Sequence, residues 1–286
     1  MGGRGCMRRW ISIVLFILAA ALLSVSIYSL MGMYREYKQA DDLHDRLQQI
    51  HETAEQPKES EEPADPKATS QPVVAPEAEE TPPVEAEQPA QERVIDAGLL
   101  ALHEENPDCI YWLTIPDTEI DYPVMFHPQD KDYYLQRDFY GDYSGSGTLY
   151  MDEDCDPEWG DNLLIYGHHM NNGTMFAALE NYKSREFYDA HPEIILQTLN
   201  GEETYRVMAA FTTPVYTGHD FAYYNFTVTG NPAEYEAFVK ECLSRSFYET
   251  GETAVYGRRL LTLSTCEYSQ KNGRMVVVAI RVHNRA

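Results

Sequence analysis

Two apolar segments near the C-terminal end constrain the fold of this chain most strongly. The first, residues 260–266, is strand-like and ends on Cys266; the second, residues 275–282, is rich in valine and follows Arg274. Because only a short loop joins them, we expect an antiparallel pair that places the cysteine beside the arginine. A neighbouring guanidinium favours the thiolate and can stabilise the oxyanion formed when it attacks a carbonyl. This pair therefore predicts acyl transfer.

A nucleophile of this kind needs a proton carrier, and residues 162–168 supply a candidate. The apolar run 163–166 is strand-like and Gly167 marks its end, so His168 lies where a strand opens into a loop, a common place for catalytic groups. Cysteine, histidine and arginine together can serve as nucleophile, acid/base and oxyanion stabiliser. The main rival is His169, which would point the other way on a continuing strand.

The C-terminal part of the chain has the pattern of a mainly β fold. Many short strands with few long helices predict a closed or nearly closed antiparallel barrel. The pair Asn200-Gly201 predicts a two-residue hairpin turn between two of the strands. The strands are expected at 111–115, 122–124, 147–151, 162–166, 193–198, 204–212, 259–265 and 275–282.

Three helical segments are expected around these strands. They cover residues 94–105, residues 174–182 and a segment that starts after Asn231. The third is the clearest, because Asn231 can act as N-cap and Pro232 suits the first turn. Its apolar stripe faces the core and consists of Tyr235, Phe238, Val239, Cys242 and Leu243.

Taken together, these motifs resemble the sortases, cysteine transpeptidases of Gram-positive bacteria, and more narrowly the class B sortases. The resemblance covers roughly residue 94 to the C-terminus. It rests on Thr-Leu-Ser-Thr-Cys at 262–266, Asn-Gly-Arg at 272–274, Tyr-Gly-His at 166–168, and Trp-Leu-Thr-Ile-Pro-Asp-Thr-Glu-Ile-Asp-Tyr-Pro-Val at 112–124.

This resemblance implies a sortase-type eight-stranded β-barrel with peripheral helices. The helix after Asn231 precedes the strand that carries Cys266, and a helix inserted there is typical of class B. Carried over residue by residue, the resemblance makes Cys266 the nucleophile, His168 the general acid/base and Arg274 the residue that stabilises the oxyanion. It implies no cofactor.

The resemblance also implies the partners of the reaction. The substrates would be secreted proteins with a C-terminal sorting signal, cleaved through a thioester acyl-enzyme. The acceptor would be an amine of a peptidoglycan precursor or of a pilin, and the sequence does not separate cell-wall anchoring from pilus polymerisation. Two other classes stay open: a cysteine hydrolase, and a non-catalytic surface module. Against a papain-like peptidase, no Cys-Gly-Ser-Cys-Trp type signature occurs and the histidine precedes the cysteine.

Strand alternation adds candidates for substrate binding. Ser264 shares a strand face with Cys266, so it could line the same groove, although a hydroxyl bonded to the backbone is the alternative. Thr265, Tyr223 and Tyr224 are the further candidates for contacts with the substrate.

The N-terminal part predicts a membrane anchor. From residue 10 to about residue 31 the chain is apolar with only serines interrupting it, which is long enough to cross a bilayer. Arginines precede the run, so the positive-inside bias puts residues 1–9 in the cytoplasm. We expect an uncleaved signal anchor at 10–32, with a cleaved signal peptide as the alternative, and a helical juxtamembrane stalk at 33–51. The catalytic domain, 93–286, is then extracellular on a single-pass protein whose partners include membrane lipid.

Composition limits what the remaining segments do. Residues 52–92 are crowded with Glu, Pro, Ala and Gln, so we expect a disordered acidic linker. The formal net charge of -24 argues against nucleic-acid binding. The acidic cluster at 152–161 invites a calcium interpretation, but its spacing does not match an EF-hand, so we expect no metal. Because the chain has 5 cysteines and the nucleophile must be free, we expect no structural disulfide.

Overall fold

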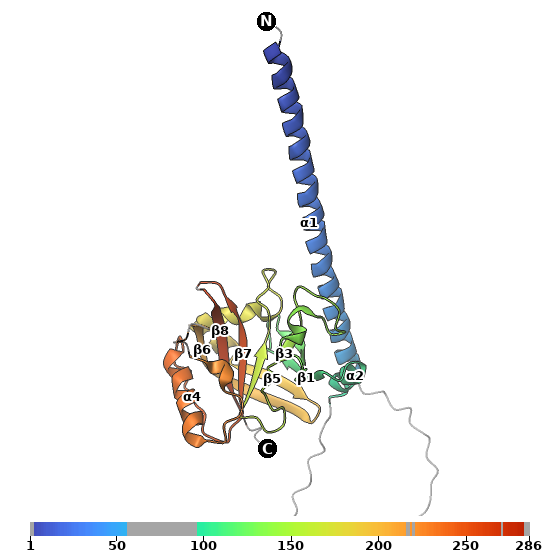
Figure 1. Ribbon diagram of the computed structural model, residues 1–286. Coiled ribbons are helices and arrows are strands. Elements are labelled where there is room, and N and C mark those ends of the chain that lie inside the picture. Colours follow the sequence, from blue (N-terminus) through green and yellow to red (C-terminus); the bar gives the residue numbers. More distant parts are fainter. Residues whose placement is uncertain (1–2, 56–95, 216–217, 219–220, 270, 283–286) are drawn as a thin grey trace, which may run out of the picture.

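The computed structural model describes residues 3–55, 96–215, 218, 221–269 and 271–282. A long N-terminal helix leads to a β-barrel with short helices around it (Figure 1). The linker expected at 52–92 lies outside the described residues, apart from the first four, which end the long helix. The α-helices are α1 (Gly3–Glu55), α2 (Ala97–Glu105), α3 (Arg185–Ala190) and α4 (Pro232–Arg245); the 3-10 helices are η1 (Tyr133–Gln136), η2 (Phe176–Lys183) and η3 (Tyr223–Asn225).

Eight strands form a closed barrel, which confirms the expected fold. Their order is β1-β2-β3-β4-β7-β8-β6-β5, and β5 pairs with β1 to close the ring. The expectation of purely antiparallel pairing is wrong, because β2 with β3 and β4 with β7 are parallel. Parallel neighbours need long return connections, and here these contain the peripheral helices. The strands are β1 (Cys109–Thr114), β2 (Asp121–Met125), β3 (Leu149–Met151), β4 (Asn162–Tyr166), β5 (Glu193–Thr198), β6 (Gly201–Pro214), β7 (Leu260–Glu267) and β8 (Gly273–Arg281).

A tight hairpin joins β5 to β6 near the expected turn. Thr198 pairs with Gly201, so the loop consists of residues 199–200, one residue earlier than the Asn-Gly pair suggested. Gly201 opens β6 with φ 120°, a conformation that favours glycine.

Residues on both faces of β7 and β8 are buried. One face contributes to the barrel core, and α4 packs on the outside of the neighbouring strand β6 (Figure 1). The cap of α4 is as expected, since the Asn231 side chain accepts a hydrogen bond from the N–H of Ala233 at 3.0 Å. Double burial explains why both strands are continuous apolar runs rather than alternating ones. The expected α4 stripe is buried at Tyr235, Phe238, Val239 and Cys242.

The other expected helices are shifted or tighter. The segment expected at 174–182 is the 3-10 helix η2, and α3 follows it unexpectedly, with Ser184 as its N-cap. The helix expected at 94–105 begins at Ala97, because the Asp96 carboxylate accepts the N–H of Leu99 at 2.7 Å and so caps it. Residues 94 and 95 lie outside the described part of the chain.

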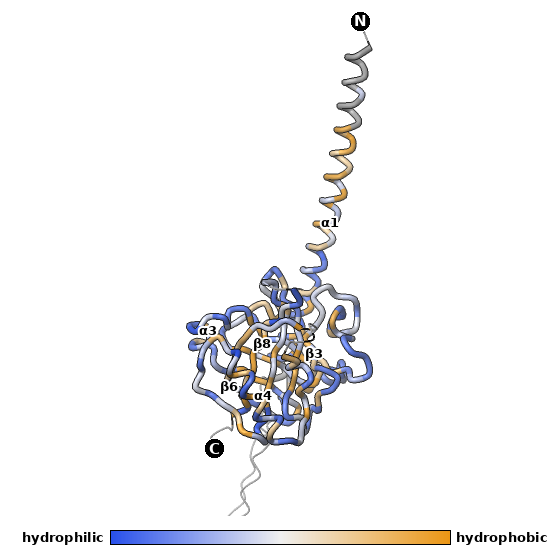
Figure 2. The backbone as a smooth tube through the Cα atoms, turned by 60° about the vertical axis from the view of Figure 1, so that its left-hand side comes forward, coloured by the Kyte–Doolittle hydropathy of each residue, from blue (hydrophilic) through white to orange (hydrophobic). Residues whose placement is uncertain are grey.

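Helix α1 is the one described helix that is long and apolar enough to cross a membrane. Its apolar stretch stands clear of the barrel and appears as the orange part of the helix in Figure 2. The expected continuation of the helix over residues 33–51 is present. Its final turns, however, pack against the domain: Leu47 is only 3% exposed and His51 only 7%.

Candidate active site

Strands β7 and β8 bring the cysteine and the arginine together. Cys266 lies directly opposite Arg274 in the antiparallel register, as the strand pair predicted. Side chains opposed in this way have Cβ atoms about 4.5–5.5 Å apart. A thiol and a guanidinium are therefore neighbours by backbone geometry alone.

The turn between these strands is fixed by a buried carboxylate that the sequence analysis did not single out. Glu267 is 3% exposed and accepts hydrogen bonds from the N–H of Ser269 at 3.1 Å and its hydroxyl at 2.7 Å. The ammonium of Lys183, from η2, lies 3.0 Å away. Burial alone would raise the pKa of Glu267, but these hydrogen bonds outweigh it and hold the pKa below its ordinary value. An ionised Glu267 thus stabilises the turn next to Cys266.

The parallel pairing of β4 with β7 places the histidine segment at the same end of the barrel. Tyr166 pairs with Ser264, and the N–H of Gly167 donates to the Ser264 carbonyl at 3.2 Å. His168 and Cys266 each follow two residues after this matched pair. Because parallel strands run in the same direction, both residues emerge at one edge of the barrel.

Glycine is required where the histidine loop begins. A Cβ on Gly167 would lie 2.4 Å from Leu149 and 2.8 Å from the ring of Phe176. Any larger residue would push the loop away from the barrel, so the close packing of this turn helps to position His168.

The two adjacent histidines have different partners. Nε2 of His168 lies 2.8 Å from the carbonyl oxygen of Leu135, whereas Nδ1 of His169 lies 3.2 Å from the carbonyl oxygen of Cys266. The His169 ring also meets the Tyr268 ring edge-on at 5.4 Å. The structure therefore brings both histidines to the Cys266 end, His168 held from one side and His169 against the cysteine backbone. The Leu135 contact comes from a distant loop, and no sequence pattern indicates it.

The Arg274 side chain is half-buried and has no carboxylate partner among the described residues. Its Nη1 donates to the carbonyl of Gly273 at 3.0 Å, and no carboxylate of a described residue forms an ion pair with it. The remaining N–H groups can therefore point to a substrate oxygen.

Exposure distinguishes Cys266 from the other described cysteines. The four cysteines of the barrel domain are all free. Burial raises the pKa of the thiols of Cys109, Cys155 and Cys242, in the case of Cys155 to about 12. These three are protonated core residues at neutral pH, which agrees with the role expected for Cys242. Cys266 alone among these four is half-exposed, so within the barrel domain it is the thiol that a substrate can reach.

The candidate substrate-binding residues lie mostly beneath the surface. Ser264 and Tyr223 are each 1% exposed, and their hydroxyls are 2.7 Å apart. Thr265 is 2% exposed and faces away from Cys266 on the strand, whereas Tyr224 is half-buried with its ring 5.5 Å from that of Tyr223. Strand alternation could not reveal the burial of Ser264, because Tyr223, which contacts it, comes from the connection between β6 and α4. A contact with the substrate stays a prediction for all four.

The acidic residues at 152–161 act as local hydrogen-bond acceptors. Asp156 accepts the N–H groups of Glu158 and Trp159 at 2.8 and 2.9 Å, and Asp161 accepts that of Thr229 at 2.8 Å. Within the part of the chain that the structure describes, no three His, Cys, Asp or Glu residues are placed to hold a metal ion.

Comparison with known proteins assigns the family. The model of the sortase domain family matches residues 113–282. Sortase B of Listeria monocytogenes is 35% identical over 180 residues, which cover 62% of this chain and 70% of that protein. Among solved structures, sortase B of Bacillus anthracis superposes with a TM-score of 0.67 at 26% identity, covering 88% of this chain and 100% of the other. The Staphylococcus aureus sortase B-substrate complex gives 0.61 at 28% identity, covering 66% and 87%.

The matched region contains strands β2 to β8 and, with them, Cys266, His168 and Arg274. The chain belongs to the sortase family of cysteine transpeptidases, and it is similar to the sortase B members of that family.

Proposed function

We propose that this protein is a membrane-anchored transpeptidase that cleaves a sorting signal near the C-terminus of secreted proteins and transfers the acyl group to a cell-wall amine. The register of three neighbouring strands carries the proposal, because β4, β7 and β8 gather His168, Cys266 and Arg274 at one barrel end. The similar Staphylococcus aureus structure is described as a substrate complex, which supports a bound substrate at a barrel of this kind. The apolar part of α1 supplies the anchor.

In the first step, the Cys266 thiolate attacks a backbone carbonyl of the sorting signal. Arg274 donates hydrogen bonds to the oxyanion of the tetrahedral intermediate, and one such donor is typically worth about 3–4 kcal/mol. His168 in its protonated form gives a proton to the leaving amine as the C–N bond breaks. The products of this step are a thioester on Cys266 and the released C-terminal fragment.

The backbone carbonyl of Leu135 orients the His168 ring in this mechanism. A ring nitrogen 2.8 Å from a carbonyl oxygen carries a proton, so Nε2–H of His168 donates to Leu135. The Nδ1 atom is then the one that exchanges protons with the amines. Fixing one ring nitrogen to set the role of the other is the usual arrangement at catalytic histidines.

In the second step, an amine attacks the thioester carbonyl. Neutral His168 takes the proton from the incoming amine, and the Cys266 thiolate leaves as the new amide forms. The acceptor is an amine of a peptidoglycan precursor or, in a pilus-forming enzyme, of a pilin lysine. Transfer rather than hydrolysis requires that the amine reach the thioester before water does.

The test uses the full-length protein in detergent micelles with a fluorescent peptide that carries an Asn-Pro-type sorting motif. Reactions are run with and without triglycine as the amine. We expect a product that contains both the acyl part of the peptide and triglycine, and no such product from Cys266→Ala. Cleavage that never incorporates triglycine would show a hydrolase, and equal activity of Cys266→Ala would contradict the assigned nucleophile.

A further inference from the structure

Helix α1 joins the proposed membrane span directly to the barrel. It contains 53 residues, so it is about 80 Å long, whereas the hydrocarbon core of a bilayer is about 30 Å thick. Its apolar stretch and the residues that pack on the domain lie on one unbroken helix (Figures 1 and 2). The span and the catalytic domain therefore share a single rigid element.

The lower part of α1 is held to the barrel by several kinds of contact. Gln48 donates to the Asp121 carboxylate at 2.8 Å, and the same carboxylate accepts Nε1–H of Trp112 at 2.7 Å. The His51 ring stacks on Trp112 with centroids 4.3 Å apart and an interplanar angle of 8°. Nε2 of His51 lies 3.3 Å from the Asp96 carboxylate. These contacts fix both the position and the rotation of the helix.

Helix α2 locks this arrangement by crossing α1 at very short range. A Cβ on Gly98 would lie 2.1 Å from the carbonyl oxygen of His51, so only glycine allows the two backbones to touch. The contact of His51 with Asp96 also places the end of α1 beside the start of α2 at one corner of the domain. The mechanical link between the membrane and the barrel is therefore α1, and not the acidic linker.

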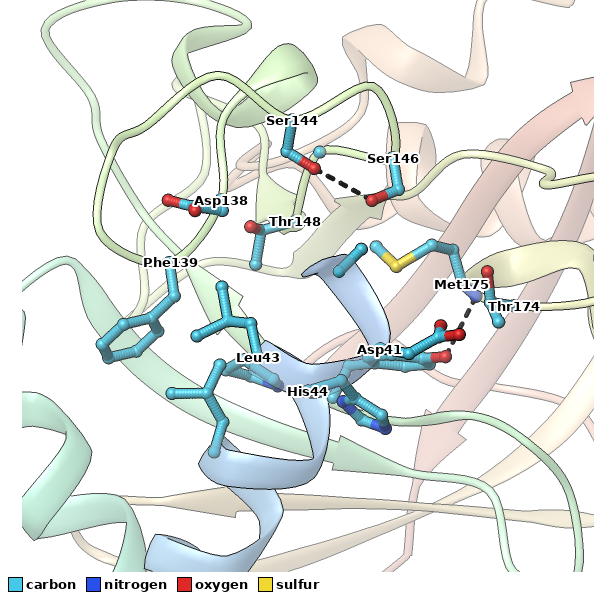
Figure 3. A pocket seen from close by; sticks show the side chains of 15 residues that line it. Asp41, Leu43, His44, Asp138, Phe139, Ser144, Ser146, Thr148, Thr174 and Met175 are labelled. Carbon is cyan, nitrogen blue, oxygen red and sulfur yellow. Dashed lines mark hydrogen bonds between the residues drawn. The ribbon is translucent and has the colours of Figure 1, made fainter. Parts of the chain in front are cut away.

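Two loops of the barrel lie along α1 just below the proposed span. Met33, the first residue after that span, lines one groove together with Tyr143 and Met170. Just beside this groove, α1 residues Asp41 and His44 line the pocket that the loop at 138–148 closes from the other side (Figure 3). From Met33 to Asp41 and His44 the helix rises only about 12–17 Å. The headgroup layer on each side of a bilayer is itself about 5–8 Å thick.

These loops lie at the reactive end of the barrel. Met170 adjoins His169, whose ring contacts the carbonyl of Cys266 at 3.2 Å. The opposite end has a separate groove, lined by Trp159, Arg258 and other residues. Because β7 has 8 residues at about 3.3 Å each, the two ends are about 25 Å apart.

We propose that the barrel end carrying Cys266 lies against the surface of the bilayer that α1 spans. The enzyme then reacts with peptide bonds that emerge within about one headgroup thickness of that surface, in substrates that are themselves held in the membrane. This inference rests on the membrane anchoring proposed above. Electrostatic attraction does not hold this end at the membrane, because the acidic side chains Glu36, Asp138 and Asp142 at the groove would be repelled by anionic lipid. The packing of α1 on the domain is what sets the position.

Fluorescence quenching measures the orientation directly. The full chain carries Cys6→Ser and Cys266→Ala, with a single bimane label at Tyr143→Cys or, as a matched control, Trp159→Cys. Both positions are exposed, at 71% and 82%, and the other three cysteines are buried. In phosphatidylcholine vesicles that contain nitroxide headgroup lipid, we expect strong quenching at position 143 and little at 159. No quenching at 143, or equal quenching at both, overturns the proposal.

Changing the length of the helix tests the consequence for substrates. Seven helical residues inserted between Tyr34 and Arg35 raise the barrel by about 10 Å and rotate it by nearly two full turns, so the orientation is kept. We expect loss of quenching at 143 and at least a ten-fold slower cleavage of a sorting peptide anchored in the vesicle by an apolar tail. The same peptide without the tail should be cleaved at the original rate.

Shortening the acidic linker by removal of residues 58–90 is the matched control, because it leaves α1 and α2 in place. Quenching and cleavage of the anchored peptide should both be retained. If the insertion leaves cleavage of the anchored peptide unchanged, or the shortened linker alone abolishes it, the inference is wrong. Failure of the unmodified enzyme to cleave the free peptide would instead count against the proposed function, while the quenching result still decides the orientation.

Discussion

The Cys266 end of the barrel and the corner where α1 meets α2 both contain a histidine, and they use it in opposite ways. At the corner, His51 is 7% exposed, stacked on Trp112 and adjacent to Asp96. At the reactive end, His168 is partly exposed and contacts the Leu135 carbonyl. At the corner, side-chain contacts hold α1 on the domain. At the Cys266 end, the pairing of the strands holds the backbone, and the side chains can contact a substrate. Substitutions should therefore separate cleanly into effects on activity and effects on docking.

The largest difference in activity is expected between variants of the two adjacent histidines. His168→Ala should lower kcat by about 10²–10⁴-fold, because general acid/base catalysis of both amines is lost. His169→Ala removes a contact to the Cys266 backbone and should cost far less. Steady-state transpeptidation of both variants checks this. The reverse order would assign the proton transfer to His169.

Arg274→Lys should lower kcat by about 10²–10³-fold with little change in stability, because a point charge does not reproduce the planar guanidinium fork. Arg281→Lys is the matched control on the same strand, where Arg281 pairs with Glu203 at 3.1 Å at the opposite barrel end. Rates and chemical denaturation of both variants give the comparison. Near-normal turnover of Arg274→Lys would contradict the assignment of Arg274 as the group that stabilises the oxyanion.

The corner should show the converse behaviour. Gly98→Ala places a methyl group against the His51 backbone and should destabilise the packing of α1 by about 1–3 kcal/mol. Cleavage of a free peptide by the variant should be unchanged, since the strands that carry Cys266 are remote from α2. Protease sensitivity after residue 40 reports the docking. A variant that loses turnover of the free peptide would show that the two regions are coupled.

A smaller effect tests the layer beneath the site. Tyr223→Phe removes the hydrogen bond to Ser264 and should cost about 1 kcal/mol of unfolding free energy. Because both side chains are buried, the KM for the peptide should change little. A large rise in KM with unchanged stability would instead place Tyr223 in contact with the substrate.

The smallest expected effect depends on pH. The pKa of Glu267 is held below its ordinary value, so its ionised form stabilises the fold above the unfolded pKa, and this contribution is lost as the pH falls through the folded pKa. Glu267→Gln should therefore be less stable than the parent at about pH 7, and the difference should shrink at about pH 3. Denaturant titrations at both values test the sign. A difference that grows on acidification would contradict it.

Local patterns predicted much of this molecule. The apolar runs gave all eight strands to within a few residues, and the Cys266–Arg274 pairing followed from one short loop. The parallel neighbours were not predictable in this way, because the pairing of β4 with β7 joins segments about a hundred residues apart. The contact of His168 with the Leu135 carbonyl was not predictable for the same reason, since the two residues are far apart in the sequence.

The packing of the last turns of α1 on the domain was not predicted, for a related reason. Their spacing predicted a helix, which is a local property, and that part was right. Burial of Leu47 and His51 depends on Trp112 and on Gly98, which lie beyond the acidic linker. For Glu267 the sequence does contain a signal, because a charged residue that continues an apolar strand is buried only when it has a partner, here Lys183.

The most direct test of the proposed chemistry is to trap the acyl-enzyme. The full-length protein is mixed with a library of peptides with Asn-Pro-type and Leu-Pro-type motifs, quenched in acid, digested and examined by mass spectrometry. We predict a peptide acyl group on the fragment that contains Cys266, removed by hydroxylamine as a thioester is and absent from Cys266→Ala. An acyl group on another residue, or one that persists in Cys266→Ala, would contradict the account.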